Sequence, residues 1–177
     1  MIDIQKEIEK KFPNMDKKEN FLKKSLFKIA KKIVHEDSIN QFLTQNSHLK
    51  GFEFVDAVLD YFDFDYAVSS NDLQNIPTSG KVVIIANHPL GGLDALCLLR
   101  LIGQIRKDVK IVANDFLAGF DALNSLIITI DNYKLKQSKS DIKKIYEALN
   151  NEEALIIFPA GEVSRATTKG IKDPTWN

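Results

Sequence analysis

The sequence has 177 residues, of which 44% are hydrophobic and 27% are charged, and this balance excludes an intrinsically disordered chain as the default. The 24 basic residues equal the 24 acidic ones, and the largest local basic excess lies in residues 1–36, where ten lysines stand against six acids. A nucleic-acid-binding domain would need a basic surface on the folded part of the chain, so that class is disfavoured.

The N-terminal region is predicted to form a basic amphipathic helix. Asp16 and Glu19 have the spacing of a capping box before a helix at residues 20–34. The apolar face would consist of Leu22, Leu26, Ile29 and Ile33, and the basic face of Lys24, Lys28, Lys31 and Lys32. Two interpretations stay open. The helix is the solvated outer layer of a bundle, or it lies on an anionic membrane surface, where each lysine adds about 1 kcal/mol.

Nothing in the sequence indicates export or a membrane span. The first residues are charged and lack the apolar core of a signal peptide, and no window approaches the length of a transmembrane helix, so we expect a cytoplasmic protein. The single cysteine, Cys97, cannot form an intrachain disulfide. Because its neighbours are aliphatic, we interpret it as a buried, unreactive thiol rather than as a nucleophile.

The next segments change from a helical to an alternating pattern. Residues 51–62 predict a helix that Gly51 precedes as a break, with a shared apolar face of Val55, Val58, Leu59 and Phe62. Residues 64–68 alternate between apolar and polar or small side chains, which predicts a half-exposed strand. Residues 69–80 are rich in turn formers and predict a connection.

The remainder of the chain alternates aliphatic strands with helical patterns. Strands are predicted at residues 81–87, 109–114, 125–131 and 153–159, and helices at residues 93–105 and 140–150. We therefore expect an α/β fold in which N-terminal helices precede a largely parallel sheet with helices on both faces. Residues 1–62 would form a helical segment that could contact a membrane, and residues 63–177 an α/β domain.

Chemistry in such sheets gathers at the carboxyl ends of the strands, where residues 87–94, 114–119 and 159–165 would lie. His88 is suited to proton transfer near neutral pH, and Asp94 could orient its ring. Gly91 and Gly92 allow unusual backbone conformations whose N–H groups could approach an oxyanion.

A structural interpretation of the same residues also stays open. Asp94 is a reasonable helix cap, two glycines often form only a turn, and a lone loop histidine is often simply solvated. A metal site is not predicted, because His35 and His48 lack ligand spacing. The sequence contains neither a phosphate-binding P-loop nor the GxSxG motif of serine hydrolases.

Two motifs together resemble a known family. ANHPLGGLD, followed about seventy residues later by FPAGEVSR, is similar to the glycerolipid acyltransferases that include the 1-acylglycerol-3-phosphate acyltransferases, and most similar to their bacterial haemolysin-like branch. The resemblance covers roughly residues 60–170. It implies an α/β domain, membrane-contacting helices before it, and transfer of a fatty acyl group from acyl carrier protein or coenzyme A to a lysolipid or amino-acid-lipid acceptor, without a cofactor. A place on the inner face of the cytoplasmic membrane would follow.

The resemblance also implies roles for single residues. His88 would be the base that deprotonates the acceptor hydroxyl or amine, and Asp94 would orient it. Residues that would contact or shape the substrate are Asn87, Gly91, Gly92, Phe158, Pro159, Gly161, Glu162, Ser164 and Arg165.

The sequence departs from the family pattern at three places. Five residues rather than four separate His88 from Asp94, so the loop must bulge to keep the two in contact. Ala160 stands where glutamate is common, and Glu162 follows the glycine instead. Asn132 stands near the place of a phosphate-binding arginine, which argues against a glycerol-phosphate acceptor.

The chain ends twelve residues after Arg165, whereas family domains usually continue. We therefore expect a domain truncated at its C-terminus. The alternative function is a membrane- or partner-binding module of the same fold with weak or absent catalysis. A third is thioesterase-like hydrolysis, in which water replaces the acceptor.

Overall fold

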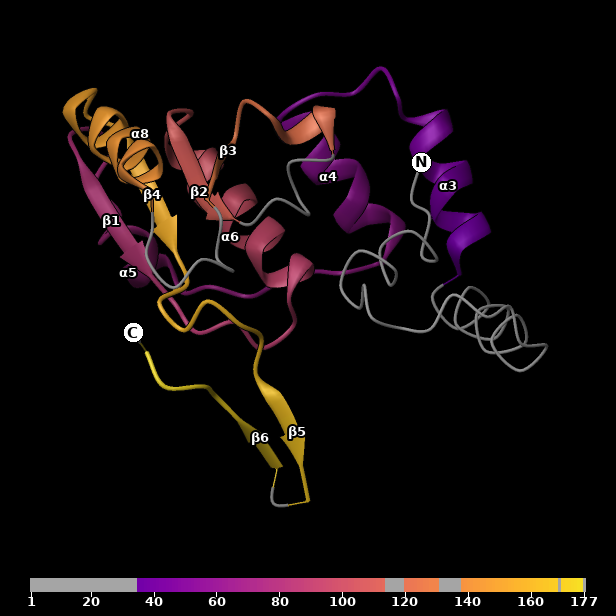
Figure 1. Ribbon diagram of the computed structural model, residues 1–177. Helices are drawn as coiled ribbons and strands as arrows, with labels where there is room; N and C mark the ends of the chain where they lie inside the picture. Colours follow the sequence, from indigo (N-terminus) through magenta and orange to yellow (C-terminus); the bar gives the residue numbers. More distant parts are fainter. Residues whose placement is uncertain (1–34, 114–119, 131–137, 169, 177) are drawn as a thin grey trace. The chain divides into compact units, whose positions relative to one another are not determined.

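The computed structural model describes residues 35–113, 120–130, 138–168 and 170–176 (Figure 1). Contacts divide the chain into two compact units, residues 1–48 and 49–177. In the first unit, helix α3 (Glu36–Gln45) begins after His35 and buries Phe42. The basic helix predicted at residues 20–34 lies outside the described residues. No described helix has both the length and the apolarity needed to cross a bilayer.

The second unit begins with helix α4 (Phe52–Tyr61), which confirms the helix predicted at residues 51–62. Gly51 adopts a positive φ of 57° at its N-cap, a conformation that favours glycine. Val55 and Leu59 are fully buried and α4 packs against helix α6 (Gly92–Ile105), while Phe62 at the C-cap is exposed. The contacts of α4 group it with the second unit. The division into domains at residue 62 stays a prediction.

Gly103 of α6 makes close packing against α4 possible. A Cβ atom built at Gly103 would lie 2.2 Å from Cε1 of Phe52, so the ring must move if any side chain is added. We expect Gly103→Ala to lower the free energy of unfolding by about 1–2 kcal/mol, because overpacking outweighs the helix-propensity gain of about 1 kcal/mol. Urea unfolding measures this. Gly92→Ala is the control, because a Cβ atom built at Gly92 would have no atom within 4 Å. Equal stability of the two variants would contradict the packing argument.

The strand predicted at residues 64–68 was wrong. The segment has no regular structure, although the side chains of Phe64 and Tyr66 are partly buried as the alternation implied. Its backbone donors are used locally: the N–H of Phe64 donates to the carbonyl of Leu59 (2.9 Å), and that of Tyr66 to the carboxylate of Asp65 (2.8 Å). The connection that follows contains the short helix α5 (Ser70–Leu73), capped by Ser69.

Four parallel strands form the sheet, which confirms the predicted fold class. They are β1 (Val82–Ile85), β2 (Val109–Ala113), β3 (Ile127–Thr129) and β4 (Ala154–Ile157). The order across the sheet is β1-β4-β2-β3, so β4 is inserted between β1 and β2. β1 is an edge strand and pairs only with β4 among the described residues.

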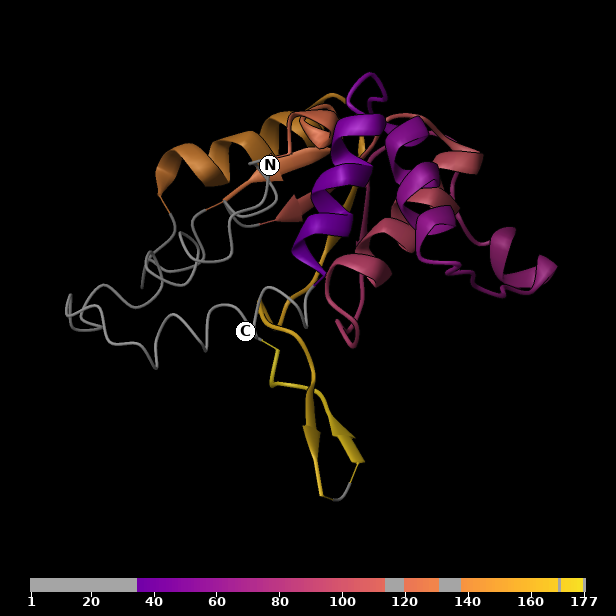
Figure 2. The same cartoon turned by 90° about the vertical axis from the view of Figure 1, so that its right-hand side faces the viewer.

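Helices cover the two faces of this sheet (Figures 1 and 2). Helix α8 (Lys139–Asn150) packs on β3 and β4, where the buried cluster consists of Val112, Ile128, Ala148 and Leu155. Helix α6 packs on β2 on the opposite side, with α4 outside it. Side chains alternate between faces along a strand, so Leu155 meets α8 while its neighbour Ile156 points to the other layer.

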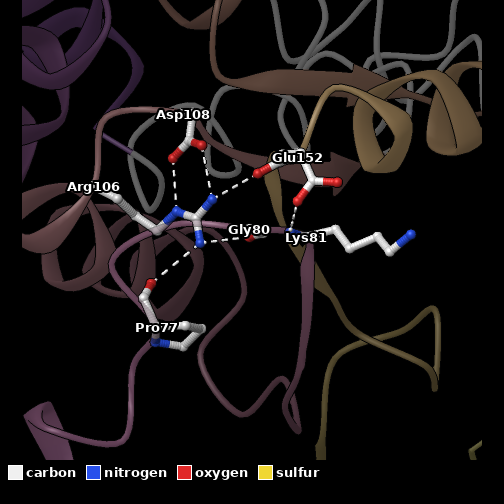
Figure 3. Close-up of polar contacts among 6 residues, drawn as sticks. All are labelled: Pro77, Gly80, Lys81, Arg106, Asp108 and Glu152. Atoms are coloured by element: carbon white, nitrogen blue, oxygen red, sulfur yellow. Dashed lines mark hydrogen bonds and ion pairs between the residues drawn. The ribbon is translucent and has the colours of Figure 1, made fainter.

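Arg106 joins the amino-terminal ends of three strands (Figure 3). Its buried guanidinium donates two 2.7 Å bonds to the carboxylate of Asp108. It also donates to the carbonyls of Pro77 (3.1 Å), Gly80 (2.8 Å) and Glu152 (2.8 Å), which precede β1 and β4. The cluster lies at the edge of the sheet opposite the carboxyl ends, so it is a structural feature of the fold.

Beyond β4 the chain forms a two-stranded antiparallel hairpin that the sequence analysis did not predict. Its strands are β5 (Arg165–Thr167) and β6 (Gly170–Lys172), with Arg165 opposite Lys172. In Figure 1 the hairpin extends from the carboxyl end of β4 and leads back toward it.

Candidate active site

The site lies where β1 and β4 end. These strands are parallel neighbours with Ile85 opposite Ile157, so the segments that follow them meet at one edge of the sheet. The motifs at residues 86–94 and 158–165, about seventy residues apart in sequence, are thereby brought together. The third predicted segment, residues 114–119, lies outside the described residues, as does Asn132.

His88 and Asp94 are in direct contact. Nδ1 of His88 lies 2.7 Å from Oδ1 of Asp94, and the two side chains are only 18% and 16% exposed. A carboxylate only accepts hydrogen bonds, so the pair places a proton on Nδ1, and in the neutral imidazole Nε2 keeps its lone pair. The arrangement can therefore accept a proton at Nε2.

The turn before α6 makes this contact possible despite the extra residue between the pair. Gly91 has a φ of 72°, which favours glycine, and it directs the chain into the first turn of α6 where Asp94 lies. The second oxygen of Asp94 accepts the N–H of Leu90 at 2.7 Å. The helix-cap interpretation of Asp94 was wrong, because Gly91 is the N-cap of α6 and Asp94 lies in its first turn. Its carboxylate holds the loop and the imidazole instead.

Phe158 holds the imidazole from another side. The rings of Phe158 and His88 stack with centroids 4.0 Å apart and planes 21° from parallel. After Phe158 and Pro159 the chain turns sharply, with the N–H of Gly161 donating to the carbonyl of Phe158 at 3.0 Å and Gly161 at a φ of 66°. The ring was predicted to shape the acceptor side, and the structure places it against His88.

The polar residues of the second motif have different surroundings. The backbone N–H of Ser164 donates to the carbonyl of His88 at 2.9 Å, which ties the two loops together. Glu162 and Arg165 form an exposed ion pair of 2.6 Å. Neither of these two side chains contacts His88 in the structure.

Asp173, which the sequence analysis missed, binds two of the predicted residues. It accepts the side-chain amide of Asn87 at 3.2 Å and the hydroxyl of Ser164. No motif or spacing marks Asp173 in the sequence, because its partners lie 86 and 9 residues away. Only the return of the β5–β6 hairpin brings it to the site.

Apolar side chains border the pair. Leu90, after His88, and Val163, in the second motif, are both exposed. The loops that carry them are adjacent, since a Cβ atom built at Gly91 would lie 3.6 Å from a methyl carbon of Val163. Gly92 has open space on the same side, with nothing within 4 Å of such an atom.

Cys97 is buried in α6, as predicted. Burial raises the pKa of its thiol, and the negative charge of Asp94 raises it further. The thiolate is therefore disfavoured at neutral pH, as expected for an unreactive cysteine. Within the part of the chain that the structure describes, no three histidine, cysteine or acidic side chains gather in a way that could hold a metal ion.

Comparisons with known proteins relate this chain to acyltransferases. A family model described as Acyltransferase matches residues 8–177. The lyso-glycine lipid O-acyltransferase of Bacteroides thetaiotaomicron is 32% identical over 177 residues, which are 99% of this chain and 63% of that protein. The lyso-glycine lipid O-acyltransferase of Phocaeicola vulgatus is 32% identical over 178 aligned residues, 99% of this chain and 61% of that protein. The chain thus spans less than two thirds of these curated relatives. No solved structure matches it with significance.

Proposed function

Since the chain belongs to the acyltransferase family, we propose that it transfers a fatty acyl group from a thioester to a lysolipid or amino-acid-lipid acceptor, with His88 as the general base. The observation that carries the proposal is the His88–Asp94 pair, which presents a free Nε2 at the edge of the sheet in a chain of this family. The names of the two relatives favour the hydroxyl of a lyso-glycine lipid as the acceptor.

The proposed reaction is a direct transfer. Nε2 of His88 takes the proton of the acceptor hydroxyl while the oxygen attacks the thioester carbonyl and forms a new C–O bond. The tetrahedral intermediate carries its charge on the former carbonyl oxygen, which the N–H groups of Gly91 and Gly92 would stabilise. The C–S bond then breaks, and the leaving thiolate takes the proton back from the imidazolium. Asp94 keeps the ring in one tautomer throughout.

The surroundings of His88 suit a lipid. The exposed apolar side chains of Leu90 and Val163 would contact an acyl chain, and Phe158 with Pro159 would close the acceptor side. The exposed pair of Glu162 and Arg165 could bind a polar head group by exchanging its internal bond for bonds to the ligand. Asn87, Gly161 and Ser164 would contribute to the wall that the two loops form.

An assay of thiol release tests the proposal. The chain is incubated with acyl carrier protein thioesters or coenzyme A thioesters, with and without lyso-glycine lipid, lysophospholipid or an acylated ornithine. We expect thiol release that depends on an acceptor and a product that carries one additional acyl chain. Release without an acceptor would indicate the thioesterase alternative, and no release with any donor would favour a binding module without turnover.

Membrane association is a further part of the proposal and rests on the lysine face predicted at residues 20–34. Sedimentation with anionic vesicles should show binding at low salt that decreases as salt rises, because screening weakens surface attraction. Changing Lys24, Lys28 and Lys31 to glutamine should lower the partition coefficient roughly a hundredfold, at about 1 kcal/mol for each lysine.

The matched control changes three exposed lysines of α8 instead, namely Lys139, Lys143 and Lys144. This variant should bind vesicles like the wild type. Equal loss of binding in both variants would show that total charge, rather than the N-terminal helix, drives association. A wild type that does not bind anionic vesicles at low salt would remove the membrane from the proposal.

A further inference from the structure

The β5–β6 hairpin returns the chain to the site. Arg165 and Lys172 face each other at its open end, so the next facing pair outward is Ser164 and Asp173. The hydroxyl of Ser164 donates to Oδ1 of Asp173 across this position. The contact therefore follows from the hairpin register and does not depend on a chance meeting of surface side chains.

The second oxygen of Asp173 reaches a different loop. Oδ2 accepts the side-chain amide of Asn87 at 3.2 Å, and Asn87 lies two residues beyond the end of β1. The carboxylate thus joins the segment after β1 to the segment after β4. The same two segments are joined once more by the bond from the N–H of Ser164 to the carbonyl of His88 at 2.9 Å.

These hydrogen bonds fix the backbone on which His88, the proposed base, lies. Asn87, directly before His88, is held through its side chain, and His88 itself is held through its carbonyl. The ring of His88 is fixed separately, by Asp94 and by Phe158. Within the described residues β1 has a sheet neighbour on one side only, so the loop after it receives less support from the sheet than the loops of inner strands.

We propose that Asp173 is a positioning residue, which acts through Asn87 and Ser164 to hold the backbone that carries His88. The inference rests on the proposed acyl transfer. Asp173 does not contact His88, so its removal leaves the imidazole and its partner in place but frees the loop. Small displacements of a base relative to its substrate lower the rate of the chemical step much more than they lower binding.

The test exchanges the two partners of one hydrogen bond. In Asp173→Asn, one acceptor oxygen remains for two donors, the Asn87 amide and the Ser164 hydroxyl, and in Asn87→Asp, two carboxylates meet. The double variant restores one amide donor and one carboxylate acceptor with their positions reversed, and the remaining amide oxygen at position 173 can still accept the hydroxyl of Ser164. We expect each single variant to lower kcat about tenfold with little change in KM, and the double variant to recover most of kcat.

Melting temperatures are recorded for the same proteins, and they should change little because the contact is exposed. Asp72→Asn is the matched control. Asp72 also accepts a serine hydroxyl at the surface, from Ser69 at 2.6 Å, but lies outside the site, so its kcat should equal that of the wild type.

Two results would overturn the inference alone: a double variant as slow as the single variants, or single variants with lower melting temperatures and unchanged kcat. A wild-type chain that transfers no acyl group would instead overturn the proposed function, and with it the role inferred for Asp173.

Discussion

Replacing His88 with alanine is expected to lower the rate of acyl transfer about a thousandfold, which lies within the range of a lost general base. The variant keeps the bond between Asp94 and the N–H of Leu90, so the turn before α6 stays connected to the helix. Its free energy of unfolding should fall by about 2–3 kcal/mol, because a hydrogen bond to a carboxylate and the stacking on Phe158 are both lost. Initial rates of thiol release and urea unfolding measure the two effects.

His48→Ala is the matched control, because His48 is an exposed histidine outside the predicted site, and its rate should be unchanged. Asp94→Asn should reduce the rate less than His88→Ala. Both oxygens of Asp94 accept a hydrogen bond, from His88 and from Leu90, and an amide retains only one acceptor oxygen. A folded His88→Ala variant with wild-type rates would rule out His88 as the base.

Replacing Arg106 with methionine is expected to lower the free energy of unfolding by about 3–5 kcal/mol, because five hydrogen bonds of about 0.5–1.5 kcal/mol each are lost. The side chain of Arg106 is 2% exposed and donates five hydrogen bonds (Figure 3). Methionine fills a similar volume but leaves three carbonyl groups and Asp108 without their donor. Small domains are stable by only about 5–15 kcal/mol, so urea unfolding should detect a large loss.

Arg100→Met is the control for losing an arginine. Arg100 pairs with Asp56 at 3.0 Å and with Asp60 at 3.7 Å, but its side chain is 27% exposed and both acids are largely exposed. A loss of less than about 1 kcal/mol is expected there. If both variants lost the same free energy of unfolding, the burial of Arg106 would not explain its contribution to stability.

The Arg106 contribution should depend on pH. The hydrogen bond from Arg106 holds the pKa of Asp108 below its ordinary value of 3.8. A group with a depressed folded pKa contributes stability above its unfolded pKa, and this contribution is lost as pH falls through the folded value. The difference in unfolding free energy between wild type and Arg106→Met should therefore shrink as pH falls below about 4.

The order and type of most elements could be predicted from the sequence. The aliphatic runs that became β1, β2, β3 and β4 are short and nearly continuous, as is typical of parallel sheets, and α6 and α8 have helical spacing between them. At the edge of the sheet, β1 nevertheless exposes Val83 and Ile85. The strand expected at residues 64–68 was wrong. The alternation predicts which side chains, such as Phe64 and Tyr66, face the protein, but it does not predict whether another strand lies beside the backbone to form hydrogen bonds with it. The insertion of β4 between β1 and β2 could not be derived from local patterns.

The candidate site could be predicted in part for the same reason. His88 and Asp94 are six residues apart around a glycine turn, so their contact is local and was expected. The stacking of Phe158 on His88 needs β1 and β4 to be neighbours, and the bonds of Asp173 need the hairpin as well. Arg106 is one of 24 basic residues, and only the fold distinguishes it from the exposed ones.

The position of β4 affects when the sheet can form during synthesis. Of the four strands of the parallel sheet, the ribosome makes β1 first and β4 last, yet β4 is the only described neighbour of β1 and also pairs with β2. Until residues 154–157 have emerged, β1 has no partner and only β2 and β3 can associate. Until then the aliphatic side chains of these strands lack part of the sheet that covers them, and such unpaired strand edges favour aggregation. Before that point His88 also lacks Phe158, whose ring stacks on it in the folded protein.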